Sequence, residues 1–487
     1  MINLIFKKFK FMKKFTLLLM LGCAFAKAQF TSPNNGTSYT LTSLSAAAPT
    51  VLVKSGTDYT LTADLTLSAT DKLLIDENTT LKVNSGITIF IYGEYKTTAG
   101  NFTITATDIA SPFKGIRFED GSVAEIRNTR VEYGGGVRVL SANFLMDNCI
   151  LYKNNGGVST SGALSFSKGS PIVSNSQFLE NSKAAIGSAA NATVSGTFSN
   201  NYFFGNVTEN INTPQINMGP GGTDSLKIIN NTIIGDRTKI MVGGISASAL
   251  AGGTNRFRIE GNTIRDNRYG ITSYASTSTG TIKNNIIENN NTQNDANLGG
   301  SGISIYGAKD VVITENQIRG NLWGITILSN GTANVGTIEN PGNNIFKNNV
   351  NGGETVALFN NTTNPINAVG NCWREDELST DAMVEEVIGS QTSNTINYKP
   401  YNCALPLSVS DVSKSAMKIY PNPSKNRFFL DTENAGNIVI QDLSGKVVHS
   451  AIVNKGKNEI NTNLQSGVYI ITQHYEGKRS NTKLIIK

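Results

Sequence analysis

The sequence predicts an all-β protein in two parts: a long solenoid of stacked parallel strands, then a small antiparallel β-sandwich. First, a six-residue motif with asparagine at both ends recurs across the middle of the 487-residue chain. Second, Gly, Asn, Thr, Ser and Ile dominate the composition, and only 16% of residues are charged. Third, roughly the last 70 residues change to short alternating strands separated by Ser-Gly and Gly-Lys turns.

A secretory signal peptide is predicted for residues 1–28. Lysines precede a short apolar run that ends in Ala26-Lys27-Ala28, so cleavage is expected between Ala28 and Gln29. The apolar run is too short for a membrane-spanning helix, which needs about 20 residues. Leu21-Gly22-Cys23 leaves a lipoprotein site as an alternative, and Met12 is an alternative start of translation.

Removal of the signal peptide balances the charge of the chain. Residues 1–28 hold six of the 42 Lys and Arg residues and none of the 36 Asp and Glu residues. The mature chain therefore carries 36 charges of each sign and lacks the basic surplus that nucleic-acid binding requires. We expect no nucleic-acid partner, no transmembrane segment in the mature protein, and a monomer.

The repeat follows the frame N-x-I-x-x-N, whose third position is apolar. Starts lie 20 to 32 residues apart, an irregular period that is typical of a solenoid whose coils differ in loop length. The apolar residue is expected to stack inward on its equivalents, while Asn suits the bends and its amide can bond along the axis. Clear copies are 201–206, 231–236, 262–267, 284–289, 316–321 and 343–348, and looser copies begin at Thr129, Cys149 and Ser176.

The repeat sets the expected domain boundaries. Regular coils are predicted for residues 115–404, first and less regular coils for 29–114, and a polar linker for 405–418. Three cysteines survive signal cleavage, and an odd number in an exported chain indicates one pair and one buried thiol. We expect a disulfide between Cys372 and Cys403, which flank the end of the repeat, and a free Cys149 in the core.

The repeat resembles the right-handed parallel β-helix family, the fold of pectate lyases and many bacterial surface proteins. The motif that carries this resemblance is specific for architecture and not for activity. Residues 419–487 resemble the type A sorting domain of the type IX secretion system of Bacteroidetes, and a carbohydrate-binding sandwich is the alternative. The sorting resemblance implies passage through the periplasm to the cell surface or medium, with the secretion machinery as partner. It is carried by Tyr420, Pro421, Asn422, Pro423, Asp442, Gly445, Lys446, Gly467, Tyr469 and Lys487.

Catalytic candidates are few, because both histidines, His449 and His474, lie in the C-terminal part. The solenoid therefore cannot hold a histidine-based triad, a histidine-containing zinc site or a histidine base. No metal site is predicted.

An atypical lyase or hydrolase remains the alternative to a protein without catalysis. Arg265 and Arg319 occupy the same outward repeat position, two coils apart. Asp266 and Glu288 are expected at equivalent positions one coil apart, about 5 Å from each other, which matches the spacing in retaining glycosidases. Two aligned acids in a solenoid are more often a solvated edge or an incidental cation site. No cofactor is expected, apart from calcium if the protein is a lyase.

Four aromatic residues are candidates for carbohydrate binding. Tyr269 and Trp323 precede equivalent Gly-Ile pairs, and Tyr274 and Tyr306 fall in nearby strands. If they face solvent they can stack on sugar rings, and otherwise they pack against adjacent coils. The resulting hypothesis is a secreted or cell-surface protein that binds polysaccharide or a surface partner without catalysis. The alternative is a polysaccharide lyase or glycoside hydrolase with a histidine-free site.

Overall fold

The computed structural model describes residues 29–487 apart from 160, 296, 378, 391–395, 404–416, 443–445 and 476–477. The predicted signal peptide, most of the predicted linker and Gly445 lie outside the described residues. The chain divides between Cys403 and Ala404 into two compact units.

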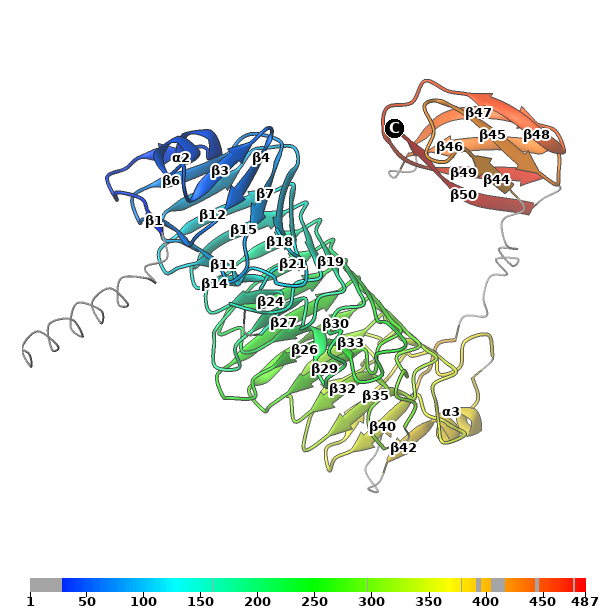
Figure 1. Ribbon diagram of the computed structural model, residues 1–487. Coiled ribbons are helices and arrows are strands. Elements are labelled where there is room, and N and C mark those ends of the chain that lie inside the picture. The colour runs from blue at the N-terminus through cyan, green and yellow to red at the C-terminus, as the bar shows by residue number, and fades with distance from the viewer. Residues whose placement is uncertain are drawn as a thin grey trace, which may run out of the picture. The chain divides into compact units, whose positions relative to one another are not determined.

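Most turns of the chain in the first unit add one strand to each of three sheets, A, B and C, in that order (Figure 1). Neighbouring strands are parallel, except that β3 and β4 of sheet C form an antiparallel pair. Sheet A contains β1 (Phe30–Thr31), β5 (Leu65–Leu67), β8 (Thr88–Ile91), β11 (Gly115–Phe118), β14 (Val137–Val139), β17 (Leu164–Phe166), β20 (Ile186–Ser188), β23 (Pro214–Met218), β26 (Gly243–Ser248), β29 (Ile271–Tyr274), β32 (Ser301–Tyr306), β35 (Trp323–Leu328), β40 (Leu358–Asn361) and β42 (Ile388–Ser390).

Sheets B and C are built in the same way. Sheet B contains β2 (Ser38–Tyr39), β6 (Lys72–Ile75), β9 (Glu94–Thr97), β12 (Val123–Arg127), β15 (Asn143–Asp147), β18 (Ile172–Ser174), β21 (Thr197–Ser199), β24 (Ser225–Ile229), β27 (Asn255–Glu260), β30 (Ser278–Lys283), β33 (Val311–Thr314), β36 (Ala333–Asn334), β41 (Ile366–Asn367) and β43 (Ile396–Asn397). Sheet C contains β3 (Leu52–Ser55), β4 (Asp58–Leu61), β7 (Thr79–Val83), β10 (Phe102–Ala106), β13 (Thr129–Glu132), β16 (Ile150–Tyr152), β19 (Gln177–Leu179), β22 (Tyr202–Phe204), β25 (Thr232–Ile234), β28 (Thr263–Arg265), β31 (Ile286–Glu288), β34 (Gln317–Arg319) and β37 (Ile345–Lys347).

The three sheets run without a break through residues 29–114, so the predicted boundary at 114 coincides with no change in the stacking. Helix α2 (Leu41–Ala47) lies at the N-terminal end of the solenoid, beside β2, β3 and β6 (Figure 1). At the other end, helix α3 (Asp381–Val387) contacts β42 and the hairpin of β38 (Val350–Asn351) and β39 (Glu354–Thr355).

The core consists of apolar columns that run along the solenoid axis. In sheet C, for example, Ile264, Ile287, Ile318 and Phe346 are paired in register and buried. Parallel strands about 4.8 Å apart bring such side chains into direct contact, and each buried isoleucine contributes about 2 kcal/mol. The apolar third position of the repeat is therefore an inward position, as the sequence predicts.

A ladder of buried asparagines runs along the bend between sheets B and C. In each rung, the backbone N–H and Nδ2 of one asparagine both donate to Oδ1 of the asparagine in the next coil. For Asn262 and Asn285 both distances are 2.9 Å. The predicted axial bonding of asparagine is thus confirmed. The rungs are Asn201, Asn231, Asn262, Asn285, Asn316, Asn344 and Asn371.

The predicted repeat frame is wrong by one residue in two coils. Asn285 and Asn344 form the ladder, whereas the predicted Asn284 and Asn343 are exposed and have φ values of 54° and 50°. Both coils begin with an Asn-Asn pair, so the sequence is compatible with a repeat that starts at either asparagine. The structure resolves the ambiguity, because asparagine tolerates the left-handed bend and a one-residue shift would turn Ile287 out of the core.

A second ladder follows the bend between sheets C and A. It contains Asn154, Asn181, Asn206, Asn267, Asn290, Asn321 and Asn349. The coil between Asn206 and Asn267 has Asp236 at this repeat position, and its side chain accepts bonds from Thr238 instead. Gln215, from the start of β23, fills the gap: its Oε1 accepts from Asn206 and its Nε2 donates to Asn267. An amide from outside the repeat can therefore complete this ladder.

The cysteines separate into a bonded pair and a buried thiol. Cys372 and Cys403 form a disulfide with Cα atoms 4.3 Å apart. Cys149 is free and buried. Its backbone N–H donates to the Ser176 hydroxyl, and the backbone N–H of Ser176 donates to Asn201, so these two residues extend the first asparagine ladder towards the N-terminus. Burial raises the pKa of the Cys149 thiol from about 9 to about 12.

Cys149 is expected to resist thiol reagents in the folded protein at pH 8, because the raised pKa leaves little thiolate and the side chain is inaccessible. In guanidinium chloride, about one thiol per mature chain should react. The folded state binds the thiol proton of Cys149 more tightly than the unfolded state does. The contribution of this thiol to the free energy of unfolding is therefore constant below pH 9. It should fall as the pH rises from about 9 towards about 12. Labelling of native protein with a colorimetric disulfide reagent is the measurement, and rapid labelling without unfolding would contradict the expectation.

The second unit is a small sandwich of two antiparallel sheets. One contains β44 (Met417–Tyr420), β45 (Arg427–Thr432) and β48 (Gly456–Asn461). The other contains β47 (Val447–Val453), β46 (Gly436–Gln441), β49 (Gly467–Tyr475) and β50 (Lys478–Ile486). Residues 417 and 418, which were predicted to lie in the linker, are the first residues of β44.

Candidate functional site on the outer face of the β-helix

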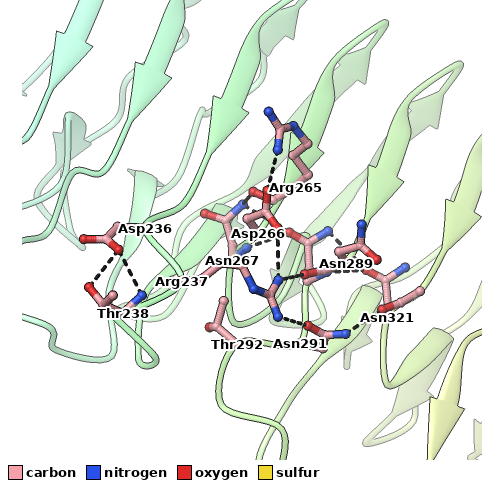
Figure 2. A network of polar contacts seen from close by, with 12 residues as sticks. Asp236, Arg237, Thr238, Arg265, Asp266, Asn267, Asn289, Asn291, Thr292 and Asn321 are labelled. Atoms are coloured by element: carbon pink, nitrogen blue, oxygen red, sulfur yellow. Dashed lines mark hydrogen bonds and ion pairs between the residues drawn. The ribbon is translucent and has the colours of Figure 1, made fainter. Parts of the chain in front are cut away.

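Asp266 lies in a polar network at the bend that follows β28 (Figure 2). Its side chain is 15% exposed, and its two oxygens accept from two different guanidinium groups. Arg237 Nη1 donates to Oδ1 at 3.0 Å, and Arg265 Nη1 donates to Oδ2 at 2.5 Å. Both oxygens of this carboxylate are therefore already engaged in charge-assisted hydrogen bonds.

Arg237 also connects this network to the next long loop. It donates to the carbonyl of Asn289 at 3.1 Å and to Oδ1 of Asn291 at 2.9 Å (Figure 2). The Asn291 side chain in turn donates to the carbonyl of Gly320, one coil further on. Arg237 thus joins loops of neighbouring coils, and the network containing Arg265 and Asp266 braces the bends.

The predicted pairing of Asp266 with Glu288 is wrong. Glu288 is in register with Arg265 on one side and Arg319 on the other, whereas Asp266 lies one position further along the chain. The error follows from the one-residue shift of the frame in the coil of Asn285. The predicted common position of Arg265 and Arg319 is confirmed, with Glu288 between them. Opposite charges therefore alternate from Arg265 through Glu288 to Arg319, and the two carboxylates do not share a register position.

Arg319 is fixed by two carboxylates. Its guanidinium donates to both oxygens of Glu375, at 2.6 and 2.8 Å, and to Glu288 at 3.0 Å. These hydrogen bonds, chiefly the one with Glu375, raise the pKa of Arg319 above its ordinary value. A lyase base must be neutral before it accepts a proton, so this environment opposes that role for Arg319.

The four aromatic candidates fall into two pairs. The Tyr269 ring lies against the backbone of Gly243 in the preceding coil, and Trp323 packs against Phe359 with ring centroids 5.0 Å apart. Tyr274 and Tyr306, by contrast, are 39% and 42% exposed and stack on each other at 5.2 Å and 18°. Only this second pair, at the ends of β29 and β32, offers a free aromatic platform among the four.

A groove of about 450 Å³ lies on the outer face of sheet A, over β20, β23 and β26. It is flanked on one side by the loop before β23 and on the other by Leu250 and the residues after β20. Ser248 in the groove is in register with Tyr274, so the tyrosine stack begins one strand beyond the groove. The lining is Ser161, Lys183, Ala184, Ser188, Ala189, Ala190, Glu209, Ile211, Thr213, Asn217, Met218, Gly219, Ser248 and Leu250.

Small and mostly hydroxylated residues form a row along the same face. They occupy one register position in successive strands of sheet A, between two columns that point into the core. Sequence reasoning missed this row, although short outward Ser, Thr and Gly residues within the strands are the signal that marks it. The row is Ser165, Gly187, Asn217, Ser246, Thr272, Ser304 and Thr326.

Described residues of the predicted sorting motif brace the second unit. The Asn422 side chain donates to the carbonyl of Lys483 and accepts from the N–H of Ile485, so it joins the first loop to the last strand. Asp442 and Lys446 close a turn through two hydrogen bonds. The hydroxyl of Tyr469, near the start of β49, donates to the carbonyl of Gln465, and the N–H of terminal Lys487 donates to Ser424. Tyr420 packs against Phe429, Gly467 begins β49, and Pro421 and Pro423 flank Asn422.

A solenoid of parallel strands with a separate antiparallel sandwich defines the class of the protein as a β-helix with a C-terminal accessory domain. Residues 65–233 match the family described as right handed beta helix region, and residues 418–487 match the family described as secretion system C-terminal sorting domain. The chain is therefore a right-handed parallel β-helix protein with a type IX secretion sorting domain. It is exported to the cell surface or the extracellular space.

Among solved structures, the chain is similar to the enzymatically active domain of tailspike protein 2 of bacteriophage CBA120. The identity is 10% and the TM-score 0.22, over 88% of this chain and 72% of that chain. No curated protein matches the chain. Within the residues that the structure describes, no helix is long and apolar enough to cross a membrane.

Proposed function

We propose that residues 29–404 bind a polysaccharide, or an extended partner at the cell surface, along the outer face of sheet A without cleaving it. The observation that carries the proposal is the groove over β20, β23 and β26, which leads to the exposed Tyr274–Tyr306 stack. The proposal concerns the passenger, while export is the task of the sorting domain.

The chemistry of this face suits a polymer of hydroxylated units. Short side chains in the row of Ser165 to Thr326 let a chain approach the sheet, and the half-buried Thr272 and Ser304 have hydroxyl groups that can both donate and accept. The two tyrosine rings add a flat apolar surface with polar tips, on which a sugar ring can stack. Repetition along the axis favours a polymer, because many weak contacts act together.

Binding without cleavage is supported by the state of the charged candidates. Asp266 is held by two guanidinium groups, and Glu288 is held by Arg319. Each would have to leave its ion pair before it could act as an acid, a base or a nucleophile.

Affinity electrophoresis in gels that contain pectin, alginate or chondroitin tests the proposal. Retardation of the purified protein by at least one polymer is expected. The double substitution Tyr274→Ala and Tyr306→Ala should weaken that retardation about tenfold. Stacking of a sugar on an aromatic surface of this size is expected to contribute about 1 kcal/mol or more to the binding free energy. Tyr92→Ala is the matched control, since Tyr92 is equally exposed at 42% but follows β8, far along the sheet. Equal loss in the control and the double variant, or no retardation by any polymer, would contradict the proposal.

A further inference from the structure

The second asparagine ladder has an open end at Asn349. In the preceding rung, the N–H and Nδ2 of Asn321 donate to Oδ1 of Asn349, at 3.1 and 3.0 Å. Asn349 is buried, and its Nδ2 donates backwards to the carbonyl of Ile318. Within the described part of the chain, no side chain supplies the next rung for its N–H and second Nδ2 hydrogen. The first ladder ends differently, because Nδ2 of Asn371 donates to two backbone carbonyls, those of Val335 and Ala368.

The next coil leaves the stack at this point and opens a cavity of about 320 Å³. Asn349 lines the cavity together with Thr355 and the segment from Trp373 to Glu377. Trp373 is 1% exposed and stacks on Phe346 at 5.3 Å, and its indole N–H has no partner among the described residues. Two buried residues at this cavity thus have donors without acceptors, and an unmatched buried donor costs about 1–3 kcal/mol.

The charged residues of the cavity are already paired. Glu375 bonds to Arg319, Asp376 to Lys347, and Arg374 contacts Glu377 and Glu386. The unmatched donors therefore belong to buried residues that line a cavity with a nearly neutral wall, which favours an uncharged acceptor over an ion.

The ladder itself indicates which acceptor fits. Gln215 completes a missing rung with a carboxamide that comes from outside the repeat, and its Oε1 accepts from Asn206 at 2.9 Å. A carboxamide oxygen at the open end would accept from Asn349 in the same way. An acetamido group carries the same oxygen on a planar amide.

We propose that this cavity binds the acetamido group of an N-acetylated sugar, whose carbonyl oxygen takes the place of the missing rung beyond Asn349. The choice of a sugar rests on the proposed function, and the site is a second one, apart from the groove on sheet A. Trp373 donates to the same ligand through its indole N–H. The volume of about 320 Å³ accommodates one such sugar unit.

The two tryptophans of the chain allow a direct test with N-acetylglucosamine as the probe. In a Trp323→Phe variant of the full chain, Trp373 is the only remaining tryptophan. Titration with N-acetylglucosamine should change its fluorescence saturably, whereas glucose, which lacks the acetamido group, should not. An equal response to both sugars, or a response to neither, would overturn the proposal.

Calorimetry with the same probe separates the roles of the residues. Trp373→Phe keeps the ring on Phe346 but removes the donor, so the affinity should fall about threefold to tenfold. Trp323→Phe is the matched control and should bind as the unchanged protein does. Asn349→Asp should abolish binding, because a carboxylate repels the acetamido oxygen, and circular dichroism checks that this variant is folded. Unchanged affinity in Trp373→Phe and in folded Asn349→Asp would refute the assignment. Retardation by polymers without acetamido groups depends on Tyr274 and Tyr306, so failure of this site and failure of the groove are distinguishable.

Discussion

Replacing Asn285 with leucine is expected to lower the free energy of unfolding of the β-helix by about 3–4 kcal/mol. Oδ1 of Asn285 accepts from the N–H and Nδ2 of Asn262, and its Nδ2 donates to Ile259, Lys283 and Asn316. Leucine removes these bonds inside a buried stack and leaves the backbone N–H of Asn262 without an acceptor, while Nδ2 of Asn262 keeps the carbonyls of Ile228 and Glu260. The measurement is the urea midpoint and slope followed by circular dichroism.

The neighbouring Asn284 provides the control. It is exposed and occupies the left-handed bend, at φ 54°, where glycine is well tolerated. Asn284→Gly should therefore change the free energy of unfolding by less than about 1 kcal/mol. Similar losses in the two variants would mean that the ladder does not hold the coils together in this frame.

Deletion of residues 419–487 is expected to abolish appearance of the protein on the cell surface and in the medium, with accumulation in the periplasm. The reason is that these residues form the sorting domain, while the signal at residues 1–28 is predicted to direct only passage across the inner membrane. Immunoblots of periplasmic, surface and medium fractions, from a host with the type IX machinery, measure the change.

Two point variants of the sorting domain refine this experiment. Ile440→Asp puts a charge into the core of the sandwich and should behave as the deletion does. Ile452→Ser changes a side chain that is 86% exposed, and export should continue at its normal level. Undiminished export of the truncated chain would refute the role given to this domain.

The fold was predictable because the repeat imposes the same choice in every coil. An apolar third position must point inward, and an asparagine at the bend can bond along the axis. The copies at 201–206 and 262–267 follow both rules in the structure. The Asn-Asn pairs were ambiguous, since both residues suit a bend and only packing of Ile287 selects the frame. Gln215 could not be predicted as a rung, because its place in the ladder depends on how the loop before β23 folds back.

The candidate site was predictable only in part. Tyr274 and Tyr306 were found because aromatic residues in neighbouring strands stand out in the sequence, and their stack lies in the open. The groove beside them depends on loops of different coils, and loop positions are not encoded in the repeat. The same holds for Asp266, whose partner Arg237 comes from the preceding coil.

Size-exclusion chromatography with light scattering, after prolonged incubation of the purified protein with a polymer that retards it, tests the central claim most directly. We expect the protein to co-elute with the polymer and the molar mass of the polymer to stay constant, with or without calcium. A falling molar mass, abolished by Arg265→Ala or Asp266→Ala, would contradict binding without cleavage and identify an enzyme. Elution of the protein apart from every polymer would contradict polysaccharide binding itself.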